Sequence, residues 1–398
     1  MIPSGAGGLW WRLDALVWLG ALASLVGIWL GYPLVLRLWA RGRARRWRRL
    51  DLSAPDADWP RLSVIVAAHN EAVHIEARIA DLRAQDYPAD RVEILVSEDG
   101  STDGTAALLE CLAAEPAAPP LRLCTAPGRA GKAAALNRAA AAAGGEVLVF
   151  TDANNTFAPQ ALRHLAAPFA DPAVGAVTGL KAVAGDAGVG GGESVYWRYE
   201  AALTRHESDT GGTVAAYGEA LAVRRECFRP LPEDVLINDD LCLALRVWSQ
   251  RRRVVAAPAA RSLEWGAADM RSEWERRRRM AAGHWQALAA ARPPAAGWPL
   301  AVRIKIWFHQ ILRPLSALFA ALALVCGLAL LWPAAAASIP AGLRLLAGLE
   351  GLAAAAVAVV GLMQAAGLRL GRVEAPWFFS VALAAAACGW WQDRRGHA

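Results

Sequence analysis

The chain has 398 residues, of which 56% are hydrophobic and only 20% are charged, against about 25% charged residues in average soluble domains. This composition excludes a disordered chain, and six cysteines without a C-x-x-C pair exclude a disulfide scaffold. The net charge of +6 does not indicate nucleic-acid binding, because seven arginines are gathered between Arg37 and Arg49, directly after an apolar run. That placement indicates a membrane.

A membrane span is the first predicted element. The 22 residues of Ala15–Leu36 carry no charge, and this length is enough to cross a hydrocarbon core of about 30 Å. The run is too long for a signal peptide, and no small-residue cleavage site precedes the arginines. The arginine-rich flank is expected to stay in the cytoplasm, so the N-terminus lies outside. Residues 1–49 are therefore predicted to be a transmembrane helix with a basic cytoplasmic flank.

Residues 50–295 are predicted to form a cytosolic α/β domain, because short β-rich runs alternate with helical stretches. The predicted strands are Leu62–Val66, Val92–Val96 and Glu146–Phe150, and the predicted helices lie near Glu71–Gln85, Thr105–Ala113 and Lys132–Ala143. This alternation favours a parallel sheet with crossover helices. Ligands of such sheets bind at the carboxyl ends of the strands.

Acidic and amide side chains follow each of the three predicted strands. They are Asn70 and Glu71 after the first strand, Asp99 and Asp103 after the second, and Asp152, Asn154 and Asn155 after the third. Each group alone also fits turn chemistry, and Asp103 fits a helix cap. Together they predict a site at one edge of the sheet. The first strand is followed by A-A-H-N-E-A and not by G-x-G-x-x-G, which argues against a dinucleotide enzyme.

Lys132 is singled out by composition. The chain has 39 arginines and three lysines, so a lysine at a predicted helix start indicates a specific need for a compact ammonium group. Backbone N–H groups at a helix start already favour an anion, and an ammonium there suits a diphosphate. The alternative is a surface lysine without a function.

The C-terminal part returns to the membrane. Residues 296–312 are predicted to form an amphipathic interfacial helix, since Leu300–Leu312 mixes apolar and basic residues; the alternative is a buried helix of the soluble domain. Residues 313–398 are predicted to hold about three spans, which are Leu315–Trp332, Leu345–Leu368 with Glu350 near its start, and Ala375–Trp391. Eleven of the 18 tryptophans lie in residues 1–40 or 298–398, as is typical of interfacial belts.

From Leu62 to Gln286 a series of motifs resembles, in unbroken order, the membrane-embedded family 2 glycosyltransferases, which include cellulose, hyaluronan and poly-N-acetylglucosamine synthases and ceramide glucosyltransferase. The motifs are V-I-V-A-A-H-N-E, S-E-D-G-S-T-D-G-T, G-K-A-A-A-L-N, T-D-A-N, Y-G-E-A-L-A-V-R-R, N-D-D and R-R-R-R-M-A-A-G-H-W-Q. The resemblance implies a GT-A domain, a Rossmann-like α/β fold that binds a nucleotide sugar, flanked by transmembrane helices.

The resemblance also implies roles for residues on the donor side. Asn70 and Glu71 stand in the first nucleotide-binding segment, and Asp99 stands where the family contacts uracil. Lys132 and Asp152 stand in the segments near the diphosphate and the metal, and Asp152 with Asn154 is expected to hold Mg²⁺ or Mn²⁺. Asn154 replaces the second carboxylate of the family's D-x-D motif, although an amide oxygen is also a ligand for these ions.

On the acceptor side the resemblance assigns Gly218 and Glu219 to the cavity wall and Asp240 to the general base. Arg276, Arg279 and Met280 take the Gln, Arg and Trp places of the family's Q-x-x-R-W motif, so the arginines are expected at the nucleotide sugar and Met280 at the acceptor, with Trp285 as a substitute ring. The alternatives are that Asp240 or Asp239 caps the helix that follows, and that some of the arginines form only a solvated or lipid-facing cluster.

The function implied is an inverting β-glycosyltransferase that moves a sugar from a UDP-sugar to a polysaccharide or other envelope acceptor. It would act at the cytoplasmic face of the inner (plasma) membrane as a multi-pass protein, with polysaccharide-export subunits as candidate partners and no nucleic acid. One alternative is transfer of a single sugar to a lipid acceptor, as in ceramide glucosyltransferase. A different class is an inactive scaffold subunit of a polysaccharide synthesis complex.

Overall fold

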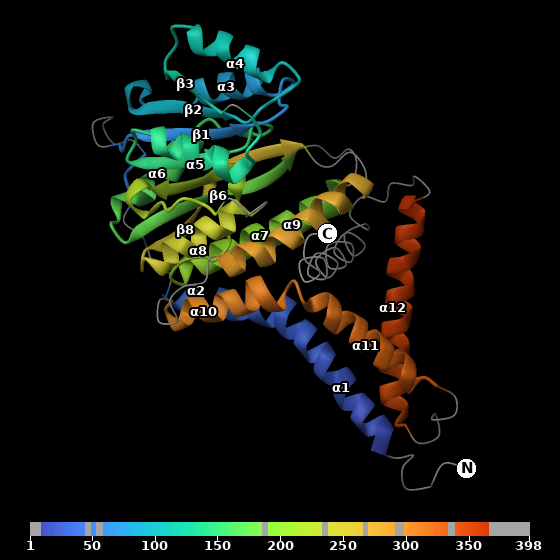
Figure 1. Cartoon of the computed structure of the whole chain (residues 1–398). Helices are drawn as coiled ribbons and strands as arrows, with labels where there is room; N and C mark the ends of the chain where they lie inside the picture. The colour runs from blue at the N-terminus through green and yellow to red at the C-terminus, as the bar shows by residue number, and fades with distance from the viewer. Residues whose placement is uncertain are drawn as a thin grey trace.

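The protein is described by a computed structural model that covers residues 9–43, 49–52, 59–126, 128–184, 190–232, 238–265, 270–290, 298–332 and 339–365. A sheet with helices packed on it forms one end of the molecule, and the apolar helices α1, α11 and α12 extend from the other end (Figure 1). The predicted span Ala375–Trp391 lies outside the described residues.

The described residues form one sheet of eight strands in the order β3-β2-β1-β4-β7-β6-β8-β5. The strands are β1 Leu62–Ala68, β2 Val92–Glu98, β3 Leu121–Thr125, β4 Val147–Thr151, β5 Thr156–Phe157, β6 Val174–Ala184, β7 Leu221–Arg224 and β8 Arg253–Trp265. The prediction of a parallel sheet is right for β3, β2, β1 and β4. It is wrong for three pairs of the other half, since β7 runs antiparallel to both β4 and β6 and β5 runs antiparallel to β8, although β6 and β8 pair in parallel.

Helices cover both faces of this sheet. The helices of the domain are α3 Ile75–Arg83, α4 Thr105–Ala114, α5 Lys132–Ala142, α6 Ala161–Ala166, α7 Gly190–Asp209, α8 Asp239–Ser249 and α9 Met270–Ala290. Short 3-10 turns occur at η3 Ala89–Arg91, η4 Ala167–Ala170, η5 Gly218–Ala220 and η6 Arg225–Cys227. The three predicted helices are thus confirmed as α3, α4 and α5. The alanine-rich sequence of α5 favours a helix, and its small side chains allow close packing against β1 and β2.

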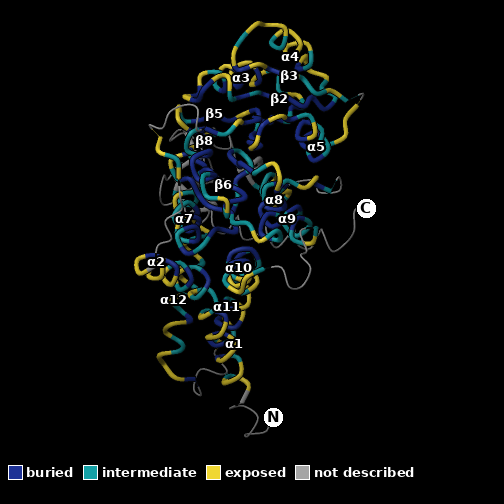
Figure 2. Tube along the Cα trace, turned by 90° about the vertical axis from the view of Figure 1, so that its left-hand side faces the viewer, coloured by how far each residue is buried: buried dark blue, intermediate teal, exposed yellow. Residues whose placement is uncertain are grey.

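The central strand β1 is buried on both faces. Val64 and Val66 belong to one core cluster, and Ile65 belongs to a second cluster on the opposite face. This division follows from the two-residue period of a strand, and it explains why the sequence of β1 is continuously apolar. Figure 2 shows β2 as mostly buried, whereas α12 has long exposed stretches.

Two helices among the described residues are long and apolar enough to cross a membrane, judged by length and composition alone: Trp10–Gly42 and Ala341–Val359. The first contains α1 Leu9–Val26, the π-helical turn η1 Gly27–Gly31 and α2 Tyr32–Arg43, and the second lies in α12 Ala341–Ala365. A third candidate span is a bent helix pair. Its first half is α10 Leu300–Lys305 with η7 Ile306–Leu312, its second half is α11 Ser316–Leu330, and the two halves meet at an angle of 57°. Glu350 of α12 accepts a hydrogen bond from the indole nitrogen of Trp18 (2.6 Å).

The segment Leu300–Leu312 is amphipathic as predicted, and its two faces have different surroundings. Val302 and Ile306 join a core cluster of the α/β domain, so the alternative of a helix buried against the domain holds for this face. Leu300 and Trp307 on the other face are exposed. An apolar exposed face beside apolar helices fits an interfacial position.

A buried charge network joins this segment to α2 and α7. Glu207 Oε1 accepts hydrogen bonds from the Tyr32 hydroxyl (2.6 Å) and pairs with His309 Nδ1 (2.9 Å), while the other ring nitrogen of His309 lies 3.4 Å from Glu200. Burial opposes the charge of Glu207, but His309 and the nearby Lys305 hold its pKa below the ordinary value. The network fixes α2 and η7 to the α/β domain.

We expect Glu207→Ala to destabilise the fold by roughly 3 kcal/mol or more, because it leaves the buried groups around it without their carboxylate. A lower midpoint of thermal unfolding in detergent would show this. The exposed Glu226→Ala is the matched control and should change the midpoint little, since surface pairs contribute about 1 kcal/mol or less. An unfolding midpoint of Glu207→Ala equal to that of the control would contradict the role of the network.

Candidate active site

A polar cavity of about 360 Å³ lies where the end of β4 meets the starts of α5 and α8. Its charged wall consists of Lys132, Asp152, Lys181, Glu219, Asp239, Asp240, Glu264 and Arg276, with Glu200, His284 and His309 on the side of α7, α9 and η7. Of the predicted strand-end and helix-start residues, Lys132, Asp152 and Asp240 line this cavity, whereas the lining residues do not include Asn70, Glu71, Asp99, Asp103, Asn154 or Asn155. Lys181 and Glu264, which the sequence analysis did not single out, belong to the same wall.

Lys132 begins α5, as predicted, and pairs with two carboxylates. Its Nζ lies 2.8 Å from Asp152 Oδ1 and 3.4 Å from Asp239 Oδ1. Burial alone would lower the pKa of Lys132, but these carboxylates raise it well above the ordinary value. Burial would likewise raise the pKa of Asp152, and the pairing with Lys132 lowers it instead. Both groups are therefore charged at neutral pH.

Asp240 is a half-buried carboxylate at the first turn of α8. Its Oδ2 accepts a hydrogen bond from the backbone N–H of Gly218 (3.0 Å), and its Oδ1 accepts one from Leu241 (2.7 Å). Burial, together with the negative charges of Asp239 and Glu219, raises the pKa of Asp240 to about 7. A carboxylate with this pKa is suited to proton transfer near neutral pH.

The helix-cap alternative for Asp240 and Asp239 is wrong. The N-cap position of α8 belongs to Asn238, which has a left-handed backbone (φ 67°) and makes no side-chain cap hydrogen bond. The Asn238 amide instead donates to the backbone oxygen of Met280 (2.8 Å). Both aspartates follow inside the helix and face the cavity.

Asp99, which the resemblance expects at the nucleotide, organises the loop that leads to Lys132. The Asp99 carboxylate accepts hydrogen bonds from the backbone N–H groups of Ala130 (3.0 Å) and Gly131 (2.7 Å). Gly100 is required here, because its φ is +72° and a Cβ would lie 2.8 Å from the backbone nitrogen of Arg129. Asp99 therefore joins the loop after β2 to the start of α5.

Asn70 and Glu71 lie in the loop after β1, which is tied to the loop after β2. Asn70 Oδ1 accepts a hydrogen bond from the backbone N–H of Thr102 (2.8 Å). Burial is the main cause that raises the pKa of the half-buried Glu71. Asp103 accepts hydrogen bonds from Thr105 at the start of α4, so the alternative of a local capping role describes Asp103.

In the T-D-A-N-N segment after β4, the side chains of Asp152, Asn154 and Asn155 have different surroundings. Asn155 is buried and donates hydrogen bonds to the Glu219 backbone oxygen (3.1 Å) and to Ser262 (2.6 Å), so it holds the loop in place. Asp152 faces the cavity and Asn154 is exposed next to it. Within the described residues no cluster of three or more His, Cys, Asp or Glu side chains is arranged to hold a metal.

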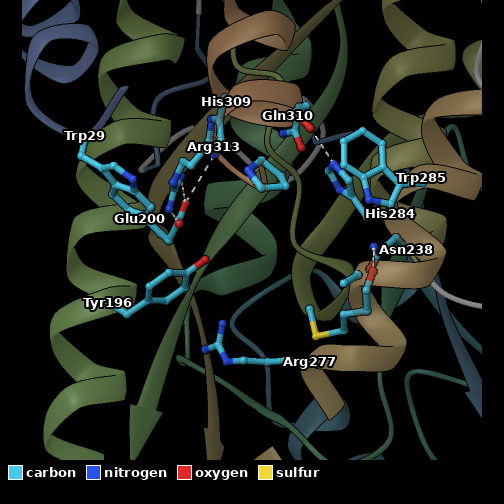
Figure 3. A pocket seen from close by; sticks show the side chains of 13 residues that line it. Trp29, Tyr196, Glu200, Asn238, Arg277, His284, Trp285, His309, Gln310 and Arg313 are labelled. Atoms are coloured by element: carbon cyan, nitrogen blue, oxygen red, sulfur yellow. Dashed lines mark hydrogen bonds and ion pairs between the residues drawn. The ribbon is translucent and has the colours of Figure 1, made fainter. Parts of the chain in front are cut away.

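A second cavity of about 220 Å³ adjoins the first. It is lined by residues that include Trp29, Tyr196, Arg277, Met280, His284, Trp285, His309 and Arg313, which come from η1, α7, α9, η7 and the turn before α11 (Figure 3). Met280 and His284 line both cavities. The indole nitrogen of Trp285 is buried without a hydrogen-bond partner. The two predicted acceptor residues on α9, Met280 and Trp285, thus face the same hollow.

The arginines of α9 point in different directions. Arg276 lines the first cavity and Arg277 the second, where it lies 4.8 Å from the centre of the Tyr196 ring. Arg279 is exposed and is not among the residues that line either cavity. The geometry therefore favours Arg276 over Arg279 as a contact of the donor.

The mixed sheet, and a charged cavity at the carboxyl ends of its parallel strands, define an α/β enzyme with a GT-A-like fold. Residues 63–229 match the family model described as "Glycosyl transferase family 2". Over these residues the chain is similar to family 2 glycosyltransferases, which supports the prediction of a hexosyltransferase enzyme.

Two curated relatives are lipid-modifying enzymes by name. A β-monoglucosyldiacylglycerol synthase of Synechocystis sp. is 29% identical over 240 residues, which cover 58% of this chain and 50% of the relative. An enzyme of the same name from Nostoc sp. is 27% identical over 280 residues, which cover 68% of this chain and 60% of the relative. The chain thus spans between half and three fifths of the length of these relatives.

One solved structure matches nearly the whole chain. The mannosyltransferase PcManGT from Pyrobaculum calidifontis, described in complex with GDP-Man and Mn²⁺, has a TM-score of 0.70 and 23% identity, with 96% of this chain and 99% of that chain covered. This likeness shows the fold, including the arrangement of the helices that flank the sheet.

Proposed function

We propose that this protein transfers a single sugar from a nucleotide sugar to a hydroxyl group of a membrane lipid, with inversion at the anomeric carbon. This is the lipid-acceptor alternative of the sequence analysis. The observation that carries it is the adjoining pair of cavities, which leads from Asp240 to the apolar helices. The names of the two cyanobacterial relatives, which describe glucosylation of diacylglycerol, support the same acceptor class.

The second cavity suits the part of a lipid that borders its head group. Its walls combine the aromatic side chains of Trp29, Tyr196 and Trp285 with polar groups, as is common where an amphipathic ligand is held. Trp29 lies in η1, within the first candidate span Trp10–Gly42, so this wall of the cavity connects the α/β domain with that span. Met280 stands where the resemblance expects a stacking Trp, and its flexible thioether holds a sugar ring with less definition, which favours single transfer over chain extension.

The reaction proposed is a displacement at the anomeric carbon. The acceptor oxygen forms the new glycosidic bond while the bond to the nucleoside diphosphate breaks, and Asp240 takes the acceptor proton. Lys132 and Arg276, which line the same cavity, are proposed to bind the departing diphosphate. Asn70, Glu71 and Asp99 are proposed to line the nucleotide side, and Gly218 and Glu219 the acceptor side.

A divalent metal fits the oxygen donors of the T-D-A-N segment. The Asp152 carboxylate and the neighbouring Asn154 amide supply hard oxygen ligands for Mg²⁺ or Mn²⁺, and the donor diphosphate supplies others. When bound, such an ion neutralises negative charge on the leaving diphosphate. Asp152 also binds the Lys132 ammonium, so the protein places a cation beside this carboxylate in either case.

The protein is proposed to lie in the inner membrane with the α/β domain in the cytoplasm. The two to three candidate spans support this placement, and the arginine-rich segment after the first span predicts its orientation. The exposed apolar face of α10 and η7 would then rest on the cytoplasmic leaflet.

The pH dependence follows from the pKa of Asp240. A general base works in its charged form, so kcat/KM should rise about tenfold per pH unit below pH 7 and level off above it. The midpoint of this rise is expected near the pKa of about 7. Rates measured from pH 5 to 9 with saturating metal check this. A profile that is flat between pH 5 and 7 would contradict the assignment of Asp240 as the base.

The proposed function is tested by product analysis with purified protein. A panel of UDP- and GDP-sugars is supplied with vesicles that contain dioleoylglycerol, and the products are separated by thin-layer chromatography and mass spectrometry. The expected product is a monoglycosyl lipid. Formation of a water-soluble polymer without lipid would instead support the polysaccharide prediction and a role for export partners. Transfer to neither acceptor would contradict both.

A further inference from the structure

Lys181 contacts residues from three elements around the first cavity, which are η5, β8 and α7. It lies toward the end of β6, and its Nζ lies 2.9 Å from Glu219 Oε1. The ammonium group also pairs closely with Glu264 of β8 and lies 4.9 Å from the centre of the Trp197 ring. Its side chain is only 2% exposed. A buried ammonium between two carboxylates holds both in fixed positions, since any of them left alone would be a costly buried charge.

One of these two carboxylates stands beside the proposed base. Glu219 directly follows Gly218, whose backbone N–H donates to Asp240 Oδ2 (3.0 Å). Glu219 and Asp240 line the same cavity, and the negative charge of Glu219 helps to raise the pKa of Asp240, after burial and the charge of Asp239. The position of Glu219 therefore influences how easily Asp240 becomes charged.

We propose that Lys181 is a positioning residue for the base, which binds Glu219 and Glu264 and so fixes the carboxylate that stands beside Asp240. The inference rests on the proposed function, because it takes Asp240 to be the base. Loss of the ammonium charge leaves the negative charge of Glu219 uncompensated, which makes Asp240 harder to ionise. Loss of the Glu219 charge has the opposite effect.

Other charged groups also face Asp240 from the elements around it. They are Asp239 on α8 itself, Lys132 on α5, Asp152 at the end of β4, Glu264 on β8, and Arg276 and His284 on α9. Apart from Glu264, which one control changes, they are the same in every variant compared below. A difference between variants in the titration of Asp240 therefore reports on the Lys181–Glu219 pair.

The experiment is an infrared titration of the full chain in detergent, which needs no substrate. The protonated carboxyl band that is lost in Asp240→Asn identifies the base. Its midpoint is expected to move up by about one pH unit in Lys181→Met and down by about one in Glu219→Gln. Lys181→Arg keeps the positive charge, so its midpoint should differ from that of the wild type by no more than about half a pH unit.

Glu264→Gln is the matched control. It removes the other carboxylate that binds Lys181, and it should move the midpoint less than Glu219→Gln does. Where Lys181→Met does not fold, Lys181→Gln replaces it, because an amide still donates to one carboxylate. Equal midpoints in wild type, the Lys181 variant and Glu219→Gln would overturn the inference. Full transfer activity in Asp240→Asn would overturn the proposed base instead, and the two failures are thus distinguishable.

Discussion

Replacing Asp240 by asparagine is expected to lower kcat for sugar transfer by about 10²–10⁴-fold while nucleotide-sugar binding stays nearly unchanged. The amide oxygen can still accept one of the two hydrogen bonds, from Gly218 or from Leu241, that hold the carboxylate, and asparagine has nearly the same size, so the cavity keeps most of its shape. What is lost is the ability to take a proton from the acceptor hydroxyl. Steady-state rates and calorimetric binding of the nucleotide sugar separate the two effects.

Asp239→Asn is the matched control for this experiment. Asp239 is the neighbour of Asp240 on α8, lines the same cavity and pairs with Lys132 (3.4 Å). Its loss should weaken donor binding, seen as a higher KM, more than it lowers kcat. The rise of activity with pH should remain, but its midpoint should move below pH 7, because the charge of Asp239 helps to raise the pKa of Asp240. If Asp240→Asn keeps near-wild-type turnover, or if Asp239→Asn abolishes the pH dependence, the base is not Asp240.

The half of the fold that the sequence predicts is the half with local signals. β1, β2 and β4 are short apolar runs followed by polar loops, and α3, α4 and α5 lie between them with regular spacing. The direction of β7 has no such signal, because it pairs with β4 across the whole of α6, β6 and α7. In addition, β7 has only four residues, and both β7 and β8 have an arginine at one end. A search of the sequence for β-rich runs therefore misses these strands.

The sequence predicts those site residues that directly follow a strand which is itself recognisable in the sequence. Lys181 and Glu264 were missed because they stand near the ends of β6 and β8, two strands that the sequence analysis did not find. The signal for Lys181 was nevertheless present. The reasoning that singled out Lys132, a lysine among 39 arginines, applies equally to the other two lysines, and both Lys181 and Lys305 are buried and paired with protein oxygen atoms.

The placement of the α9 arginines depends on helix geometry that motif matching does not use. At about 100° per residue, the positions of Arg276, Met280 and His284 fall on one face, which lines the cavities. Arg279 is rotated by roughly 60° from Arg276, in the direction away from Met280 and His284, so it lies outside that face. Motif spacing fixes the order of residues along a helix, whereas the packing of the helix decides which side faces the ligand.

Metal removal is expected to have the second large effect. EDTA should reduce transfer by at least about 10²-fold, and excess Mg²⁺ or Mn²⁺ should restore it, because developing charge on the diphosphate is costly to leave without a compensating cation. Lys132 and Arg276 lie on the same wall, yet Lys132 is already paired with Asp152 and Asp239, so its charge is not fully available. Full activity in EDTA would contradict the metal assignment.

Asn154→Asp tests the same site without removing the metal. The added carboxylate should tighten binding of Mn²⁺ in the presence of UDP, measured by calorimetry, since carboxylates bind hard cations more strongly than amides do. Asn154→Ala should weaken it, whereas Asp103→Asn, in a carboxylate that caps α4, should leave it unchanged. Equal Mn²⁺ affinity in all three variants would contradict the assignment of Asn154 as a ligand of the ion.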